Sequence, residues 1–266
     1  MSVTDGLRYR VSANNLSRAS ENKIHDDAVA RRFGFTGALV PGVEVYAYAC
    51  HPAVQRWGRA WLERGRLECR FLKPVYDGKL VEVTAAEEAE GGLALRVESE
   101  GVLCATGRAG LDAAAPPPAI ADWRWQAPPE TRPPADEASL APGTWLGTRP
   151  LPLTPEVAAD YLQGVGETET LYGDEGLAHP GMILRQCNQA LTQNVVLGPW
   201  IHVGSKVQNF SAARLGETLS ARARVVANYE AKGHRLVDLD VLVMAGGERV
   251  LARVLHTAVW RPRGSG

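Results

Sequence analysis

One segment of the chain gathers the residue types that could do chemistry, and it reads ASENKIHDDAVARRFGFTGALVPG from position 19 to position 42. His25 titrates near neutral pH without much tuning, so it suits the role of a general acid/base. Ser20 and Asn22 can position a water molecule through hydrogen bonds, although a serine does not exchange a proton near pH 7 as a carboxylate can. The segment predicts proton transfer at His25. The alternative interpretation is a hydrogen-bonded polar residue at a packing seam.

The acidic residues beside His25 have structural explanations. Asp27 is predicted to be the N-cap of a helix AVARRF, because a carboxylate there can accept bonds from free backbone N–H groups. Glu21 follows Ser20 directly, and neighbours in an extended segment point to opposite faces. His25, Asp26 and Asp27 are adjacent and cannot all turn to one ion, so we predict no metal site.

The Pro41-Gly42 pair is predicted to begin a long apolar helix, GVEVYAYA and onward. A glycine there lets a ligand carbonyl approach the free backbone N–H groups at the positive end of the helix. Such a contact would polarise a carbonyl and stabilise an enolate-like transition state. The alternative is a plain helix start, which explains the Pro180-Gly181 pair equally well.

The elements that position these groups occur twice. One Pro-Gly pair begins at position 41 and another at position 180, and each opens an apolar helical stretch. The pairs lie 139 positions apart (180 − 41), as do Phe71 and Phe210 (210 − 71), so both landmarks keep one register. Long stretches typical of strands follow each helix, with Gly-Gly or Gly-Glu pairs at hairpin turns.

Two repeated units of this kind predict an α+β fold. A helix followed by a long antiparallel sheet is buried most compactly when the sheet wraps around it, and two units can join their open edges. Proline crowds residues 116–148, which lack helical or strand periodicity. We therefore predict an N-terminal unit at 1–115, a Pro-rich linker at 116–148 and a C-terminal unit at 149–262. Trp123, Trp125 and Trp145 should pin the linker to the surface, because exposed tryptophans are costly.

The 19–42 segment resembles the signature of (R)-specific enoyl-CoA hydratases and MaoC-like dehydratases. In that signature a Gly-Asp-x-Asn-Pro-Leu-His core precedes x-Asp, an Ala-rich helix, a Phe-x-Gly turn and a Gly that opens the central helix. The later segment CRFLKPVYDGKLVEV is similar to the family's Phe-Leu-x-Pro-Val-x-x-Gly strand. The resemblance covers both halves except the linker and implies a double hot-dog fold. The matching residues of the signature are Asn22, Ile24, His25, Asp27, Phe35, Gly37 and Gly42.

The resemblance implies a catalytic role for each of four residues. His25 would be the acid/base, the Gly42 N–H the oxyanion donor, and Asn22 and Ser20 the groups that position water. The chain departs from the family at one of them. The family's acidic partner stands five residues before the histidine, and that position holds Ser20. Loss of a general acid/base lowers a rate by roughly 10² to 10⁴, so this substitution weakens the reaction without abolishing it.

The second half carries VGETETLY in place of the signature, with Glu167, Glu169 and Tyr172 at the Asp, Asn and His positions. This copy has lost the dyad. Glu167 and Tyr172 could assist His25 only if the two sites shared one cleft.

The ligand implied by the resemblance is an acyl thioester of coenzyme A or of an acyl carrier protein, from fatty acid or polyketide metabolism. No cofactor is implied, because the thioester itself acidifies the α-proton. The two tyrosines of the helix GVEVYAYA favour a short or functionalised acyl group. Arg66 and Lys206 are further candidates for phosphate contact, although charged strand residues usually face solvent. The predicted substrate-binding residues are Val40, Pro41, Tyr46, Arg70 and Lys73.

The composition of the chain indicates which classes of partner and which cellular compartment to expect. Lys and Arg number 29 against 30 Asp and Glu, a net charge of −1, so no global field favours nucleic acid or an anionic membrane. The four cysteines are scattered as in a reducing compartment, and no run of about 18 apolar residues appears. We expect a cytoplasmic protein, and leave open whether two chains pair as a homodimer.

Three functions fit these residues. The first is a lyase that hydrates a 2-enoyl thioester or dehydrates a 3-hydroxyacyl thioester. The second is thioester hydrolysis, which the same fold supports and which needs a water-activating group aimed at the carbonyl carbon. The third is a non-catalytic subunit that binds acyl thioesters, motivated by Ser20 and by the degraded second copy.

Overall fold

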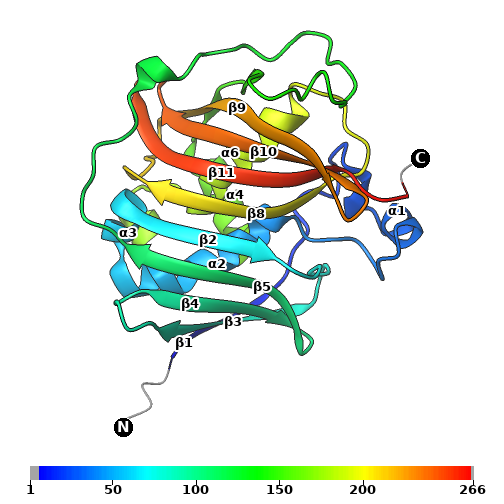
Figure 1. Ribbon diagram of the computed structural model, residues 1–266. Coiled ribbons are helices and arrows are strands. Elements are labelled where there is room, and N and C mark those ends of the chain that lie inside the picture. Colours follow the sequence, from blue (N-terminus) through cyan, green and yellow to red (C-terminus); the bar gives the residue numbers. More distant parts are fainter. Residues whose placement is uncertain (1–5, 265–266) are drawn as a thin grey trace.

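The computed structural model describes residues 6–264, which form one antiparallel sheet of eleven strands wrapped around two long helices (Figure 1). The sheet runs in the order β1-β3-β4-β5-β2-β8-β11-β10-β9-β6, and β7 pairs with β9. The first five strands in this order belong to the N-terminal half of the chain and the others to the C-terminal half. The strands are β1 (Leu7–Ser12), β2 (Gly65–Phe71), β3 (Leu80–Glu87), β4 (Leu93–Ser99), β5 (Val102–Leu111), β6 (Trp145–Gly147), β7 (Leu151–Pro152), β8 (Ile201–Asn209), β9 (Thr218–Ala231), β10 (His234–Ala245) and β11 (Arg249–Arg261).

The two halves join through an antiparallel pair, β2 with β8, whose register runs from Arg66 opposite Gln208 to Arg70 opposite Gly204. Each half would otherwise expose an open edge at this strand, with unpaired backbone N–H and C=O groups. The predicted joining of two sheet edges is confirmed. Residues of β2 and β8 that are far apart in sequence therefore lie side by side.

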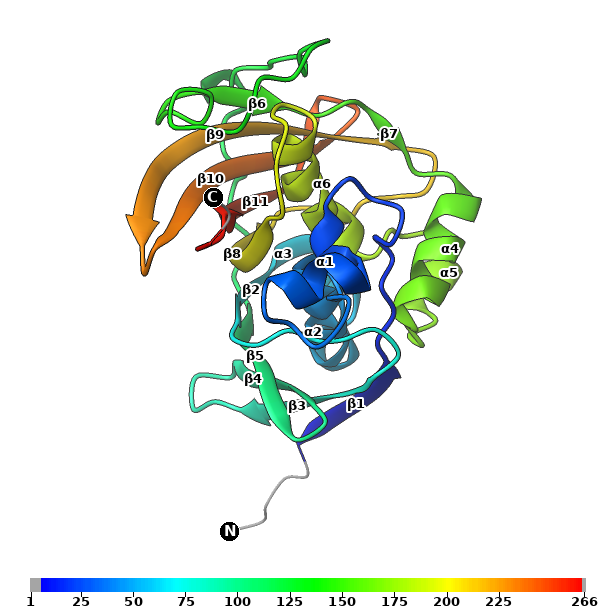
Figure 2. The same cartoon turned by 90° about the vertical axis from the view of Figure 1, so that its right-hand side faces the viewer.

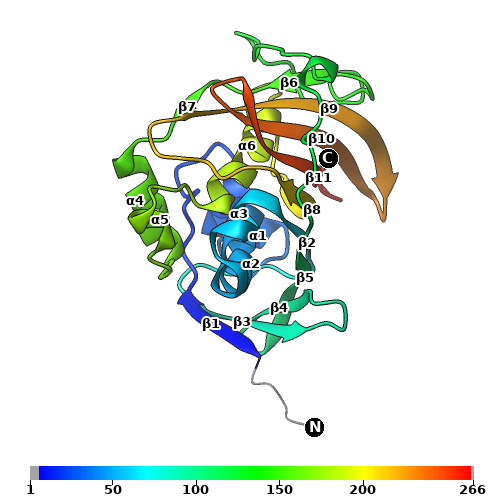
Figure 3. The same cartoon turned by 90° about the vertical axis from the view of Figure 1, so that its left-hand side faces the viewer.

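Helices α2 (Gly42–Trp57) and α6 (Pro180–Thr192) occupy the concave face of the sheet, as Figures 2 and 3 show from opposite sides. Every residue of α2 from Val43 to Val54 is buried, as expected of a helix that is covered on all sides. Both helices begin at the predicted Pro-Gly pairs. The remaining helices are α1 (Asp27–Arg32), α3 (Arg59–Arg64), α4 (Pro155–Val165), α5 (Leu171–Asp174) and two 3₁₀ turns at Lys23–His25 and Ile120–Asp122.

A buried ion pair connects the two central helices. Glu44 of α2 is fully buried, and its Oε1 accepts a hydrogen bond of 2.7 Å from Arg185 Nε of α6. Burial raises the pKa of Glu44, and the guanidinium of Arg185 opposes that shift. The pair therefore couples the halves through their helices as well as through β2 and β8.

The segment between β5 and β6 crosses the surface of the C-terminal half. Trp123 is buried against Leu242, Met244 and Val250, and Trp145 packs against this cluster. Their rings meet edge to face with centroids 6.2 Å apart. Trp123 pins the segment as predicted, whereas Trp145 belongs to strand β6 and pairs with β9 in the sheet. The prediction was wrong for Trp125, whose side chain is 61% exposed.

No helix within residues 6–264 is long and apolar enough to cross a membrane.

Candidate active site

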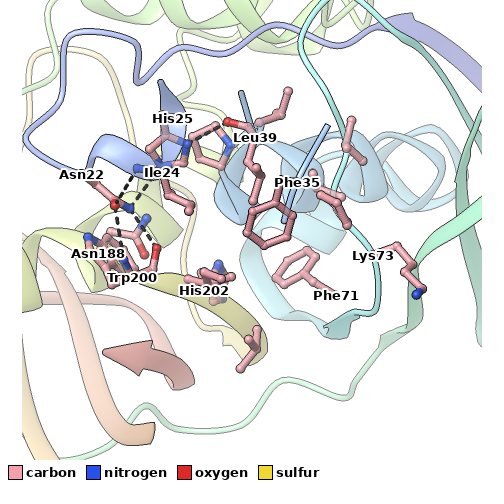
Figure 4. Close-up of a pocket in the computed structure, with 18 of the residues that line it drawn as sticks. Asn22, Ile24, His25, Phe35, Leu39, Phe71, Lys73, Asn188, Trp200 and His202 are labelled. Carbon is pink, nitrogen blue, oxygen red and sulfur yellow. Dashed lines mark hydrogen bonds between the residues drawn. The ribbon is translucent and has the colours of Figure 1, made fainter. Parts of the chain in front are cut away.

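A cavity of about 210 Å³ opens where the N-terminus of α2 meets strand β8 (Figure 4). Most of its lining is apolar, with Phe35 and Phe71 among the larger side chains. Polar groups reach it from both halves of the chain. They are Asn22, His25, Lys73, Asn188 and His202.

His25 ends the 3₁₀ turn Lys23–His25, and its ring is held in one orientation. Its Nδ1 lies 2.7 Å from the backbone oxygen of Leu39, which can only accept, so Nδ1 carries the proton and Nε2 carries a lone pair. Burial lowers the pKa of His25 below 6.5, and the hydrogen bond to Leu39 opposes this shift. At neutral pH the ring is therefore a neutral base whose basic atom is Nε2.

Asn22 ties this base to the C-terminal half. Its Nδ2 donates to the backbone oxygen of Trp200 at 3.0 Å, and its Oδ1 accepts from the Trp200 N–H at 3.3 Å. The same Nδ2 lies 3.3 Å from His25 Nε2. The Asn22 amide is thus saturated by protein groups. It positions His25 against the second half, whereas the sequence predicted that it would hold water.

The N-terminus of α2 meets the cavity without a side-chain cap. The N-cap residue is Pro41, and the Gly42 N–H has no hydrogen-bond partner among residues 6–264. A Cβ at position 42 would lie 2.8 Å from His202 Nδ1 and 3.2 Å from Phe71 Cε2, closer than such contacts normally come. The glycine therefore keeps the helix end open to a ligand carbonyl or anion.

The corresponding end of α6 is sealed. His179 caps it by accepting from the Gly181 N–H at 3.0 Å, and its Nε2 lies 3.2 Å from Glu167 Oε2. Glu167 Oε1 in turn lies 2.7 Å from His51 Nδ1. Burial alone would raise the pKa of Glu167, but hydrogen bonds from His179 and His51 lower it instead. Protein side chains fill the place that a ligand would take in this half.

Six of the predicted site residues line the cavity: Asn22, His25, Val40, Pro41, Gly42 and Lys73. Lys73 is exposed at its edge, where its ammonium group could meet an anionic ligand. Five predicted residues do not line it, namely Ser20, Tyr46, Arg70, Glu167 and Tyr172.

The five misplaced residues have identifiable reasons. Tyr46 is fully buried on a different face of α2, and Arg70 points to solvent from β2. Glu167 and Tyr172 belong to the sealed cluster of the C-terminal half, where the Tyr172 ring packs against His179 at 4.9 Å. The condition that the two sites share one cleft is not met. Neither residue can stand in for the missing carboxylate.

Ser20 faces a second, more polar groove that shares Asn22, His25, Asn188 and Trp200 with the cavity. Its hydroxyl lies 3.4 Å from the Asn22 backbone oxygen. Arg132 from the Pro-rich segment borders this groove and pairs with Glu21 at 2.9 Å. Ser20 does not line the cavity, but the groove that it borders also reaches His25, so its role in positioning water stays a prediction.

The N-cap prediction was wrong by one residue. Asp26 caps α1, accepting from the backbone N–H groups of Ala28 and Val29 at 2.9 and 3.1 Å. Asp27 Oδ1 instead accepts from the Ala38 N–H at 2.7 Å. Asp27 thereby closes the loop between α1 and α2 and fixes the approach to the cavity.

Sequence reasoning missed two polar residues that the C-terminal half contributes. Asn188 of α6 lines the cavity, and its Oδ1 is buried without a partner among the described residues. His202 of β8 is 5% exposed and lines the cavity beside Gly42. Neither residue belongs to the signature, and only the pairing of β2 with β8 brings His202 to Gly42. The sequence offered little signal, because β8 is a mixed strand in which polar residues also stand at Ser205, Lys206, Gln208 and Asn209.

The cavity has no acidic wall. Within residues 6–264, no Asp or Glu side chain lines it, and no group of three or more His, Cys, Asp or Glu residues could hold a metal ion. The ionisable side chains that line it are those of His25, Lys73 and His202.

Neither a family model nor a curated protein sequence matches the chain. Solved structures do. A conserved hypothetical protein from Mycobacterium tuberculosis, described as having a double hotdog fold, is similar with a TM-score of 0.64 at 16% identity, over 97% of this chain and 96% of that one. A MaoC-like dehydratase gives 0.60 at 15% identity, over 96% and 98%.

A further similar structure, provisionally named a thioesterase, comes from Novosphingobium aromaticivorans and gives a TM-score of 0.54 at 13% identity, over 98% of this chain and 100% of that one. Dehydratases and thioesterases thus share this architecture, and such low identities speak for the fold alone. Because the similarity spans both halves and the central helices, the chain is a double hot-dog protein whose structural neighbours include MaoC-like dehydratases.

Proposed function

We propose that this protein is a hydro-lyase that acts on acyl thioesters, adding water to a 2-enoyl thioester or removing it from a 3-hydroxyacyl thioester. The observation that supports the proposal is the juxtaposition of two groups in one largely apolar cavity. One is a neutral histidine base, His25, whose Nε2 carries the lone pair and accepts a hydrogen bond of 3.3 Å from the Asn22 amide. The other is the uncapped helix N-terminus at Gly42.

The two groups would share the reaction as follows. The thioester oxygen binds at the Gly42 N–H, where the positive end of α2 stabilises the negative charge of an enolate. His25 Nε2 exchanges its hydrogen bond with the Asn22 amide for one with water, and takes a proton from that water as the water oxygen bonds to C3. The resulting imidazolium returns that proton to C2, so the elements of water add across the double bond. Dehydration is the reverse.

Two other functions remain as alternatives to be distinguished. Hydrolysis would require a water aimed at the thioester carbon, and no carboxylate among the described residues lines the cavity to activate one. A non-catalytic binding subunit would retain the cavity and lose turnover. The absence of any Asp or Glu of residues 6–264 from the lining favours the binding subunit over hydrolysis.

The decisive test is an ultraviolet assay of crotonyl-CoA and longer enoyl-CoAs, in which hydration removes the absorbance of the conjugated thioester. We expect His25→Gln to lower kcat by roughly 10² to 10⁴, the usual contribution of a general acid/base. Because burial lowers the pKa of His25, kcat/KM should decrease on the acid side with a midpoint below pH 6.5. Ser20→Ala should change kcat by less than about threefold, since Ser20 does not reach the cavity.

His234→Gln is the matched control, because His234 lies at the start of β10 and does not line the cavity. Release of free coenzyme A without hydration would establish the hydrolase alternative. If enoyl- and hydroxyacyl-CoAs bind and none is turned over, the binding-subunit alternative is correct and the proposed reaction is wrong.

A further inference from the structure

Three buried side chains form a hydrogen-bonded chain behind the cavity: His202 and Ser205 of β8 and His256 of β11. Ser205 Oγ lies 2.8 Å from His202 Nε2 and 3.0 Å from His256 Nδ1. The two imidazole rings stack with centroids 4.1 Å apart. His256 is fully buried and does not line the cavity, so only the His202 end of the chain reaches a ligand.

The direction of these bonds follows from a backbone carbonyl. His202 Nε2 also lies 3.1 Å from the Gly204 oxygen, which can only accept. Nε2 therefore carries the proton, and the neutral ring has its lone pair on Nδ1. Burial and the neighbouring His256 lower the pKa of His202 well below 6.5, which keeps the ring in this neutral form.

The Nδ1 lone pair has no partner. It is buried and accepts no hydrogen bond from any residue between 6 and 264. Phe71 packs its ring against the imidazole with centroids 4.7 Å apart, and a Phe71 ring cannot donate a conventional hydrogen bond. A buried acceptor left in this way destabilises the fold unless something else satisfies it.

Gly42 lies beside Nδ1. A Cβ built on Gly42 would be 2.8 Å from Nδ1 and 3.2 Å from Cγ, so only a glycine leaves space at this edge of the imidazole. The acceptor is therefore adjacent to the helix end that would hold a thioester oxygen.

We infer that His202 Nδ1 accepts a hydrogen bond from the hydroxyl group at C3 of the substrate, or from the water that becomes it. The inference rests on the proposed function and assigns the second polar contact of that site to the C-terminal half. His202 touches the hydroxyl and orients it, while His25 transfers the proton. A hydroxyl can donate to this acceptor, whereas a saturated acyl chain cannot.

Two amide substitutions separate this role from a structural one. His202→Asn places a side-chain oxygen near the position of Nδ1 and gives up the contact with Ser205. His202→Gln reaches the position of Nε2, keeps the contact with Ser205 and gives up the cavity acceptor. His202→Phe keeps a ring against Phe71 and His256, and it removes both the cavity acceptor and the contact with Ser205.

The readout is the ratio of affinities for (R)-3-hydroxybutyryl-CoA and butyryl-CoA, measured by calorimetry in the His25→Gln background so that the hydroxylated ligand is not consumed. His202→Gln and His202→Phe should lower this ratio roughly 3- to 10-fold, the contribution of one hydrogen bond, and should lower kcat in the presence of His25. His202→Asn should keep the ratio within about twofold.

The proposal is overturned if His202→Gln leaves the ratio unchanged, or if His202→Asn lowers it as much as His202→Gln does. The second result would show that the bond to Ser205 carries the effect. If wild-type protein turns over no thioester, the proposed reaction fails, but the affinity ratio measured on wild type and the same variants still tests the contact at His202.

Discussion

Two glycines at matching helix starts have opposite surroundings. Gly42 lines a cavity, and its N–H has no partner among residues 6–264, whereas the Gly181 N–H is bonded to His179 at 3.0 Å. A Cβ at Gly181 would lie 2.0 Å from the Tyr161 hydroxyl, so the backbone there is packed against protein. Equal sequence signals therefore mark a ligand site in one half and a structural contact in the other.

Alanine at each glycine should separate these roles. Gly42→Ala pushes a methyl group against His202 and Phe71, and we expect kcat/KM to fall at least about tenfold because the oxyanion contact is displaced. Gly181→Ala should cost about 1–3 kcal/mol of unfolding free energy by overpacking, with kcat/KM of the folded protein unchanged. Enzyme assays and urea denaturation measure both. A Gly181→Ala protein that folds well but has lost activity would contradict the assignment.

Some residues of the candidate site could be predicted from local motifs in the sequence, and others could not. His25 and Gly42 could be predicted because their chemistry depends on neighbours in the same segment. Asp26, not Asp27, is the N-cap of α1. Either of two adjacent aspartates could cap the helix, and the sequence does not show at which of them the helix begins. His202 could not be predicted as a site residue, since its place depends on which strands meet across the seam.

At the scale of elements, α2 and α6 are coupled by a charged contact in an otherwise apolar interface. Glu44 has no exposed surface, while the Arg185 side chain keeps 32% of its own. Such a pair contributes little net stability when intact, because desolvation offsets the attraction. Replacing only one of the two side chains is strongly destabilising, since the other charge then stays buried without a partner.

Arg185→Met should lower the free energy of unfolding by about 3–5 kcal/mol, because Glu44 stays buried and unpaired. The double variant Glu44→Leu/Arg185→Met should recover most of that loss, since no charge then remains in the interface. Urea denaturation of the wild type and the three variants, with Glu44→Leu as the fourth corner of the cycle, gives the coupling. Independent, additive losses would show that the two side chains do not interact.

The elements themselves followed from the repeat. A Pro-Gly start, a buried helix and hairpins at glycine pairs are local signals, and the structure has them at Gly42, Pro180 and the β10–β11 turn, where Gly246 and Gly247 take positive φ. The sealed cluster around Glu167 was not predictable. Its partner His51 comes from α2 of the other half, so no pattern within the C-terminal half indicates it.

At the scale of the whole molecule, burial keeps several histidines uncharged. Burial lowers the pKa of His256 to about 3, and it also lowers the pKa of His25 and His202 below 6.5. The unfolded chain takes up protons at these residues near pH 6.5, whereas the folded protein does not. Their contribution to stability is therefore fully present above pH 6.5 and is lost as the pH falls below it.

We expect the free energy of unfolding to drop between about pH 7.5 and 5.5, by up to about 1.4 kcal/mol per pH unit below 6.5 for each of these histidines. His256→Phe removes one such group from the interior and should make the drop smaller. Urea denaturation at both pH values tests this. An equal drop in wild type and His256→Phe would show that His256 does not remain neutral in the fold.

The relation between the halves was predictable as far as the sheet is concerned. Two units with open edges imply a joined sheet, and β2 pairs with β8 accordingly. The different contributions of the two halves to the cavity could not be predicted, because they depend on which side chains lie at the N-terminus of each central helix. In this molecule the N-terminal half supplies His25 and Gly42, and the C-terminal half supplies Asn188 and His202.

The capped start of α6 has a consequence for how such a chain can change over generations. In a pair of identical single units, every substitution is copied into both sites, so a residue that fills one helix start fills the other as well. Joining the units in one chain removes that constraint. Here His179 and Glu167 fill one helix start while Gly42 stays open at the other, so the two halves of one chain carry different substitutions at matching places.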